Sequence, residues 1–485
     1  MKRIFIGIAA VIFLVLAIMV VRALMVASPA VEAAAPPIPV DSNAVAQHLA
    51  EAIRFQTVSY GDGIKEDEKN MALEAMHQWM ENTFPYFHEA AGPEQFGESL
   101  LFTWIGKNPN LPPVLVMAHM DVVPVVPGTE KDWMHAPFSG DVAGGFVWGR
   151  GAIDDKGQLV SILEAANTLA MSGFQPERTI MFAFGQDEEV GGGKGNAVIA
   201  KALAARGTHF AWVLDEGSSI MNEPYPGVRR PVAFVSNAEK GYLSLELTAH
   251  GLGGHSARPS RDLALPRLSS AILNVVSHPF ESDLDDIQRA KFAVLAPLVP
   301  FGDRMMLANL WLMKPFVLRR MEASADSAAT LHTTISPTVL NAGIKENVIP
   351  PTARGIINFR LHPRDTIASV IAHVKQAIND ERVDVTEREE TISEATKVVA
   401  TDSPAFVYVS NLIKATYGVP IAPEIMTGAT DSRHYIPMAD AVLRFRPFHT
   451  ELSDLPRVHG TNERVAVNDL GPMVGFYMRL IQDLK

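Results

Sequence analysis

Apolar strand-like runs alternate with helical runs from Asn43 to Asn237, and this alternation constrains the fold more than any other feature of the chain. Short apolar runs are typical of buried strands, whereas longer runs with apolar residues three and four apart are typical of helices. The strand-like runs cover residues 111–119, 178–189 and 209–217, and the helical runs cover residues 158–173 and 195–207. This order predicts a doubly wound α/β domain with functional residues at the carboxyl ends of its strands.

A second pattern interrupts the first between residues 240 and 391. Its order of strand, helix, two strands, helix and strand is typical of the ferredoxin-like βαββαβ unit. The α/β pattern resumes after Thr391 and continues to the C-terminus. We therefore predict a catalytic domain in two parts, residues 40–239 and 392–485, with a smaller domain inserted at residues 240–391.

The composition limits the chemistry that the chain can perform. Its 485 residues are enough for two or three domains, and its net charge of −12 argues against nucleic acid as a partner. The chain contains no cysteine, which excludes disulfides, thiolate nucleophiles and zinc sites built on sulfur. Any metal ion must therefore be bound by His, Asp and Glu.

The N-terminus carries an apolar segment that is separate from the predicted domains. An uncharged run from Ile4 to Val21 follows Lys2 and Arg3, and about 18 apolar residues are enough to begin spanning a bilayer. Basic flanking residues stay in the cytoplasm, which places the body of the chain outside it, in a periplasm, a lumen or the exterior. Residues 1–39 are predicted to be a signal anchor and tether, and a secretory signal cleaved near Ala33–Ala35 is the alternative.

His119 and Asp121 lie at the end of a strand-like run that begins at Val114. Because they are two residues apart, their side chains leave the sheet on the same side. An imidazole and a carboxylate that project together from a strand end suit a metal site or an acid–base pair. An isolated His-x-Asp pair is more often structural than functional. A functional assignment therefore needs further candidate ligands elsewhere in the chain.

Acidic groups at other segment ends can complete it. Asp154 and Asp155 lie in a glycine-framed turn before a helix, where an N-cap is the structural alternative. The carboxylates of residues 187–189 end the next strand, and such like charges are costly unless a cation shares the space, although a solvated loop would also carry them. Asp215 ends the following strand, and His459 lies in a loop near the C-terminus.

Two imidazoles and three carboxylates without sulfur suit two Zn²⁺ ions that share a bridging aspartate. Manganese or cobalt would also accept this set. The predicted metal ligands are His119, Asp154, Glu189, Asp215 and His459.

Seven motifs occur in the order HMDVVP, GRGAIDDKG, DEEVGG, LDEG, GGHSARP, NVIP and RVHGTNE. With them, nearly all of the chain from Asp41 resembles the co-catalytic dizinc peptidase family of aminoacylase, carnosinase and glutamate carboxypeptidase. It is most similar to the carboxypeptidase S (Gly-Xaa carboxypeptidase) branch and its secreted relatives that act on N-acyl amino acids. The resemblance implies that Asp154 bridges the metals and precedes a cis peptide. It pairs His119 with Asp215 at one metal, and Glu189 with His459 at the other.

The resemblance also implies catalytic roles. Metal ions lower the pKa of a bound water to about 7, and Glu188 is expected to be the general base that takes its proton and returns it to the leaving amine. Asp121 is expected to orient His119 through its other ring nitrogen. A structural carboxylate is the alternative at both positions.

Further residues are expected to contact substrate. His255 would stabilise the oxyanion of the tetrahedral intermediate, often from a partner subunit, which makes the inserted unit a lid or dimerisation domain. Arg360 would bind the substrate carboxylate, with Gly428 contacting the same group. Asn347 would help near the oxyanion. The alternatives are a surface loop for His255 and a turn before Pro350 for Asn347.

The segment from Arg289 to Met321 is rich in Leu, Met, Phe and Val. It is expected to be core or a helix pair closing the lid. It could instead line an apolar pocket for hydrophobic side chains or acyl tails, or press against the membrane beside the anchor.

The leading prediction is an exported, membrane-anchored zinc exopeptidase, a carboxypeptidase or dipeptidase that hydrolyses the amide next to a free C-terminal carboxylate. The alternative is an N-acyl-amino-acid amidohydrolase of the aminoacylase type. Substrates would be small peptides or N-acyl amino acids, and a homodimer is a further expectation. A non-catalytic binding relative is the rival of another class, and the complete ligand set together with Glu188 argues against it.

Overall fold

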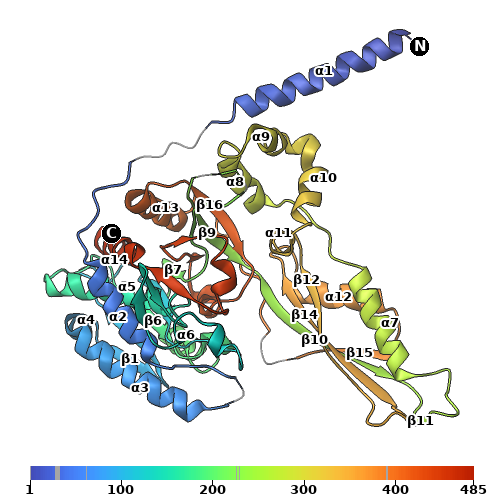
Figure 1. Ribbon diagram of the computed structural model, residues 1–485, viewed down its shortest axis with the longest axis horizontal. Helices are drawn as coiled ribbons and strands as arrows, with labels where there is room; N and C mark the ends of the chain where they lie inside the picture. The colour runs from blue at the N-terminus through green and yellow to red at the C-terminus, as the bar shows by residue number, and fades with distance from the viewer. Residues whose placement is uncertain (1, 28–32, 62, 226, 229, 389–391) are drawn as a thin grey trace.

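The computed structural model describes residues 2–27, 33–61, 63–225, 227–228, 230–388 and 392–485. A large α/β body and a smaller one lie beside each other, and the helix α1 (Lys2–Leu24) projects away from both (Figure 1). The predicted fold class of α/β is confirmed.

A ten-stranded sheet forms the large body. Its strands, in spatial order, are β1 (Pro93–Phe96), β2 (Ser99–Trp104), β6 (Ile180–Gly185), β3 (Val114–His119), β7 (Trp212–Asp215), β17 (Val442–Arg444), β9 (Val232–Glu239), β8 (Ile220–Met221) and β18 (His449–Thr450), with β16 (Ile421–Met426) paired to β9. The central strands β6, β3, β7 and β17 run parallel. Their carboxyl ends therefore meet at one edge, where sheets of this class bind their ligands.

Helices cover both faces of this sheet. One face shares a core with α2 (Ser42–Arg54), α3 (Glu66–Thr83), α4 (Pro85–Ala91), α5 (Lys156–Met171), α13 (Pro404–Tyr417) and α14 (Val467–Asp483), and the other face packs on α6 (Asn196–Ala205). Val116 of β3 lies in the first core and its neighbour Met117 in the second. A central strand with two covered faces must be apolar throughout, which is why residues 114–118 read as a continuous apolar run.

The smaller body is a four-stranded antiparallel sheet with two helices. In chain order its elements are β10 (Gly241–His250), α7 (Ala264–Ser277), β12 (Thr334–Ala342), β14 (Thr352–Leu361), α12 (Ile367–Ile378) and β15 (Val383–Glu387), and the spatial order is β12-β14-β10-β15. This is the βαββαβ order expected from the sequence. Every second residue of β10 is buried, as a sheet with one covered face requires. The predicted boundary at Thr391 lies outside the described residues.

Two small sheets complete the strands. They are formed by β4 (Asp141–Ala143), β5 (Phe146–Trp148) and β19 (Arg464–Ala466), and by β11 (Gly254–His255) with β13 (Val348–Ile349). The β11–β13 pair lies at the end of the smaller body that points away from the large one (Figure 1).

Four helices lie between α7 and β12. They are α8 (Asp286–Leu295), α9 (Phe301–Leu307), α10 (Leu310–Met321) and α11 (Ala325–Ala329), and we call them the helical lobe. The lobe has its own small apolar core, which includes Phe292 and Val317. The helix expectation for residues 289–321 therefore holds, with more helices than the expected pair.

The helix α1 is long and apolar enough to cross a membrane, by length and composition. The predicted tether behind it packs in part against the large body, because Ala35 N donates to Ala415 O at 2.8 Å and Arg479 Nη2 donates to Pro36 O at 2.6 Å.

Candidate metal centre and active site

Two groups of ligand-type side chains lie at the carboxyl edge of the large sheet and share Asp154. His119 comes from the end of β3, Glu216 follows β7, and Glu189 follows β6 in a short turn. Within each group, one ligand atom per residue lies within 4.8 Å of the others. The ends of β3, β6 and β7 meet there because parallel strands end at the same edge, and two loops carry Asp154 and His459 to the same place.

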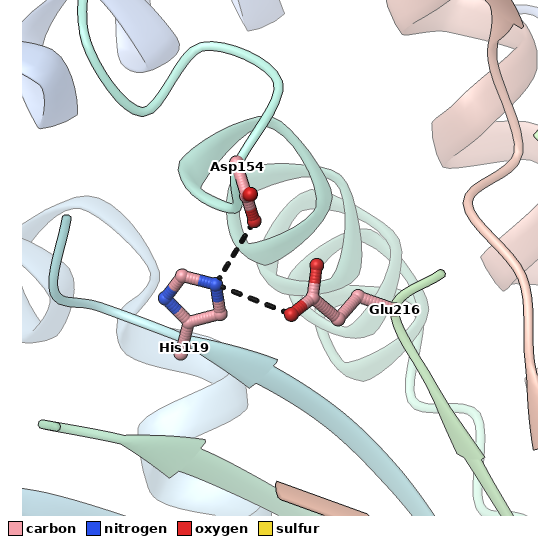
Figure 2. Close-up of side chains that lie close together, drawn as sticks. All are labelled: His119, Asp154 and Glu216. Atoms are coloured by element: carbon pink, nitrogen blue, oxygen red, sulfur yellow. Dashed lines mark hydrogen bonds and ion pairs between the residues drawn. The ribbon is translucent and has the colours of Figure 1, made fainter. Parts of the chain in front are cut away.

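The first group contains His119, Asp154 and Glu216. His119 Nε2 lies 3.2 Å from Asp154 Oδ1 and 3.4 Å from Glu216 Oε1. Figure 2 shows this imidazole nitrogen facing both carboxylates. Two carboxylate oxygens and one imidazole nitrogen converge on one point, as in sites with three protein ligands and an open position.

The second group contains Asp154, Glu189 and His459. His459 Nε2 lies 3.2 Å from Asp154 Oδ2 and 3.2 Å from Glu189 Oε2. The two oxygens of Asp154 thus face two different imidazoles, which is the arrangement of a bridging carboxylate. The peptide bond between Asp154 and Asp155 is cis, as the resemblance implied.

The prediction that Asp215 is a ligand needs correction, because Glu216 takes its place in the group. Asp215 is the last residue of β7, and its carboxylate accepts from Glu216 N at 2.9 Å and from Ser432 N at 2.8 Å. Side chains of consecutive residues point in opposite directions at a strand end, so one residue decides which carboxylate faces His119.

The charge balance of this cluster fits a cation. Burial raises the pKa of Glu216 to about 8, with Asp154 adding to the effect, and burial also raises the pKa of Glu188. Hydrogen bonds that His459 donates to the carboxylates of Asp154 and Glu189 raise the pKa of His459 to about 10. Oε1 of Glu189 is buried without a hydrogen-bond partner. Crowded carboxylates that must keep protons are costly, and cations with nitrogen and oxygen ligands remove that cost.

Asp121 holds the turn that carries two of the candidate residues. Its carboxylate accepts from Ser59 Oγ at 2.7 Å, from Glu188 N at 3.1 Å and from Glu189 N at 3.3 Å. His119 Nδ1 lies 2.9 Å from the backbone oxygen of Asp121 and 3.4 Å from its carboxylate. The hydrogen bond to His119 is therefore made by the backbone, whereas the carboxylate fixes the turn.

Sequence reasoning missed a clamp beneath the bridging residue. The Glu463 carboxylate accepts from Asp154 N at 3.0 Å, Ile153 N at 2.7 Å and Arg150 Nη1 at 2.7 Å. Arg150 Nη2 also donates to the backbone oxygen of His459 at 3.0 Å. The clamp joins the two loops that carry Asp154 and His459. Arg150 lies in the motif GRGAIDDKG and Glu463 in the motif RVHGTNE. The position of Glu463, four residues after His459, was therefore a usable signal.

Arg446 was also missed. Its Nη1 lies 3.4 Å from Asp154 Oδ1 and 3.4 Å from Glu216 Oε2. It follows β17, the fourth parallel strand, so the rule that functional residues follow strand ends would have found it.

A cavity of about 670 Å³ opens above the metal groups. Residues of the inserted domain and of the large body line it together, among them Tyr242, Arg360, Met426, Gly428 and Ala429. Nη1 of Arg360 is buried without a hydrogen-bond partner, and its guanidinium lies 4.6 Å from the centroid of the Tyr242 ring. The predicted substrate residues Arg360 and Gly428 are therefore in the same cavity as the metal groups.

The structure does not bring His255 and Asn347 to this cavity. Both are exposed at the distal β11–β13 pair, where Ser256 N donates to Asn347 O at 3.2 Å. Neither residue lines the cavity described above.

A doubly wound sheet with imidazole and carboxylate groups at its strand ends is the architecture of a metal-dependent hydrolase. The family model described as "Peptidase family M20/M25/M40" matches residues 115–483. The chain belongs to this family of hydrolases, whose metallopeptidases depend on metal ions, and the predicted family and enzyme class are confirmed.

Relatives support the same assignment. The "Probable carboxypeptidase S-like 2" of Dictyostelium discoideum is 36% identical over 445 residues, which cover 91% of this chain and 85% of the relative. The "N-fatty-acyl-amino acid synthase/hydrolase PM20D1" of Xenopus tropicalis is 34% identical over 445 residues, covering 90% and 85%. The solved M20 family metallo-carboxypeptidase Sso-CP2 of Sulfolobus solfataricus matches with a TM-score of 0.64 at 15% identity, covering 90% of this chain and 98% of that one. That last likeness shows the shared fold.

Proposed function

We propose that the chain is a dinuclear metal-dependent hydrolase that cleaves the amide bond next to a free C-terminal carboxylate. The observation that carries the proposal is Asp154, whose two oxygens face two different imidazoles beneath a cavity that also holds the guanidinium of Arg360. Two Zn²⁺ ions are the proposed cofactors, because imidazole nitrogen and carboxylate oxygen are zinc ligands in catalytic sites, with Co²⁺ or Mn²⁺ as substitutes.

Five residues of this chain would hold the two ions. His119 and Glu216 would bind one ion, Glu189 and His459 would bind the other, and Asp154 would bridge them. The ions supply Lewis acidity and a water acidic enough to ionise near neutral pH.

Glu188 is proposed as the general base. Its side chain lines the cavity beside the metal groups, and its backbone amide is fixed by the Asp121 carboxylate. Burial, with Glu216 as the next cause, raises the pKa of Glu188, which suits a carboxylate that has to accept and then release a proton. It would take a proton from the attacking water and deliver it to the nitrogen of the leaving amine.

Arg360 is proposed to bind the carboxylate of the substrate. A buried guanidinium nitrogen without a partner is costly, and a bidentate carboxylate would satisfy it. Gly428 and Ala429 line the same cavity, and their backbone amides are proposed to contact the same carboxylate.

Small peptides and N-acyl amino acids are both substrates that this arrangement fits. Each has an amide one carbon away from a free carboxylate, so one anchor at Arg360 serves both. Apolar residues such as Ile392, Met426 and Val458 also line the cavity and favour a hydrophobic group on the far side of the amide. We give the exopeptidase as the first candidate and the N-acyl-amino-acid amidohydrolase as the second, because relatives of both kinds are similar to this chain.

We propose that the active form is a homodimer. His255 would then stabilise the oxyanion in the site of the partner subunit, with Asn347 beside it, since both are exposed at the far end of the inserted domain. We also propose that α1 anchors the body to a membrane on its extracytoplasmic side, because α1 is apolar, largely exposed and begins with the basic residues Lys2 and Arg3.

A turnover screen with metal analysis tests this function. The purified chain should contain two metal ions per subunit and hydrolyse dipeptides or N-acyl amino acids, but not the same compounds with an amidated carboxylate. An Arg360→Lys variant should raise KM for the free acids, because a single ammonium cannot replace the bidentate guanidinium. Equal turnover of free acids and their amides would contradict the proposal.

A further inference from the structure

One face of α10 is exposed and apolar although the helix belongs to a folded lobe. Trp311, Leu312 and Phe316 expose 56%, 41% and 61% of their surface. They occupy consecutive turns of α10, followed one turn later by the exposed Arg319 and Arg320. We call residues 311, 312 and 316 the α10 face.

The opposite side of the same helix packs into the apolar core of the lobe. Val317 is 5% exposed and packs with Phe292 and Leu331. The α10 face is therefore not needed to fold the lobe, and an exposed aromatic cluster of this kind marks an interaction surface.

The α10 face lies on the lobe that receives the end of α1. Asn309 Nδ2 donates to Met19 O at 3.1 Å, Arg22 Nε donates to Ala308 O at 3.2 Å, and Ala23 is fully buried. The rest of α1 points away from the protein (Figure 1). A bilayer crossed by α1 would thus end at the lobe.

The charge of the lobe differs from that of the chain. Residues 286–329 contain six Lys or Arg and four Asp or Glu, whereas the whole chain has a net charge of −12. Apolar and aromatic residues with basic residues at their edge are typical of helices that lie in a membrane interface.

We infer that the α10 face docks onto the surface of a lipid bilayer that contains anionic lipid, beside the point where α1 enters it. The inference rests on the proposed anchoring of α1. Trp311 and Phe316 enter the headgroup region, and Arg319 faces the lipid phosphates. Arg320 beside it pairs with Asp303 at 2.5 Å.

Docking places the lobe between the bilayer and the cavity. Lys291 of α8 pairs with Glu424 of β16 at 2.6 Å, and Met426 at the end of β16 lines the cavity. Strand β16, which ends at a wall of the cavity, is therefore tied to the lobe by this ion pair.

Tryptophan quenching by brominated lipid tests the docking. The full chain is reconstituted in nanodiscs of phosphatidylcholine and phosphatidylglycerol, with and without bromine on the upper acyl carbons. Of the six tryptophans, Trp104, Trp133, Trp148 and Trp212 are buried and Trp79 is partly buried in the large body, whereas Trp311 is exposed. We expect a bromine-dependent loss of emission that the Trp311→Phe variant abolishes.

A matched pair of leucine variants checks the face itself. Leu312→Glu should reduce the quenching, because it places a carboxylate in the interface. Leu265→Glu should leave it unchanged, since Leu265 is equally exposed, at 42%, but lies on α7. Both variants should hydrolyse a soluble dipeptide at the wild-type rate.

Three outcomes would overturn the docking. The first is a chain that enters nanodiscs through α1 with the same emission in brominated and plain lipid. The second is Trp311 emission that changes with the number of protein copies per nanodisc but does not change with brominated lipid. That result would mean that the α10 face binds a second copy of the chain. The third is a chain that stays outside the nanodiscs, which would overturn the anchoring as well. Dipeptide turnover in the same samples reports the enzymatic proposal separately.

Discussion

The metal centre and the β11–β13 end of the inserted domain differ in whether contacts within one chain hold their functional side chains in place. At the centre, Asp154 is held by the Glu463 clamp, and Asp121 fixes the turn of Glu188 and Glu189. At β11–β13, His255 Nδ1 accepts a hydrogen bond from Ala257 N of its own loop, and the side chain is exposed.

This difference has a physical consequence. Groups that must act on developing charge have to be oriented before the reaction, in a site from which water is excluded. The groups of the metal centre are oriented within one chain, whereas His255 is oriented for the reaction only after another surface covers it. Variants of the two regions should therefore fail in different ways.

The largest effect is expected from Glu188→Gln. The amide cannot accept the proton of the attacking water, so kcat should fall by about 10²–10⁴-fold, the range typical of a lost general base. Steady-state kinetics on the preferred substrate measures it.

Metal analysis is the control for this variant, because Glu188 is not among the candidate ligands. The metal content should equal that of the wild type. Unchanged turnover in a fully metallated variant would remove Glu188 from the mechanism.

His255→Ala should lower kcat by about 10²–10³-fold if the imidazole stabilises the oxyanion. Mixing it with Glu188→Gln under conditions of subunit exchange should restore about a quarter of wild-type activity, since half of the dimers are mixed and each has one complete site. Activity after mixing measures this.

Complementation separates the two regions. A mixture that stays as inactive as its parents, in protein shown to be dimeric, would mean that His255 does not serve the site of the partner. Glu188→Gln mixed with Glu216→Gln is the matched control, because both changes lie in the same site and no complete site can form.

Metal affinity should distinguish Glu216 from its neighbour Asp215. Glu216→Gln should weaken binding of one ion by more than the about 10–100-fold that loss of a supporting residue costs. Asp215→Asn should keep both ions and lose stability by about 1–3 kcal/mol, because its carboxylate satisfies two buried backbone amides. Titration with zinc and thermal unfolding measure the two effects, and the reverse pattern would restore Asp215 as the ligand.

The same pair shows how far sequence reasoning reaches. The run before Asp215 predicted a strand correctly, and a strand end predicted a ligand there. Which of two adjacent carboxylates faces His119 depends on where the pleat ends, and a one-residue shift reverses the side. The motifs predicted His119, Asp154, Glu189 and His459 as ligands, and the structure brings these four side chains together.

Tertiary partners were harder to predict. Arg446 and Glu463 act on residues distant in the sequence. Their positions after β17 and four residues after His459 marked them as candidates, but the sequence does not show which distant group each one contacts. The α10 face is a similar case. The composition of residues 289–321 was compatible with a core segment, the lining of an apolar pocket or a membrane contact. Only the packing of Val317 in the core of the lobe shows which residues of α10 remain exposed.

Asp121→Asn should have a smaller effect. The amide keeps one acceptor oxygen, so the turn of Glu188 and Glu189 loosens while the His119 contact to the backbone oxygen of residue 121 remains. We expect kcat to fall by about 10–100-fold with metal content nearly unchanged. Loss of metal as severe as that of a ligand variant would show instead that Asp121 supports His119 through its carboxylate.

The smallest effect concerns the pH dependence of stability without metal. Burial raises the pKa of Glu216 from its ordinary 4.5 to about 8, and hydrogen bonds to Asp154 and Glu189 raise the pKa of His459 from 6.5 to about 10. Between these values the folded apoprotein binds more protons than the unfolded chain, so its stability falls as the pH rises from about 4.5 towards about 10.

Metal ions replace those protons, so the stabilisation by metal should grow with pH. Thermal unfolding of chelator-treated and metal-loaded protein at about pH 5 and pH 8 measures it, and the difference in Tm should be larger at the higher pH. In Glu216→Gln the apoprotein should lose less stability over this range, because the neutral amide has no proton to release. A Tm difference that is the same at both pH values would mean that the carboxylates and imidazoles of the cluster do not hold extra protons in the folded apoprotein. The contrast between the metal centre and the β11–β13 end would then rest on hydrogen bonds alone and not on electrostatics.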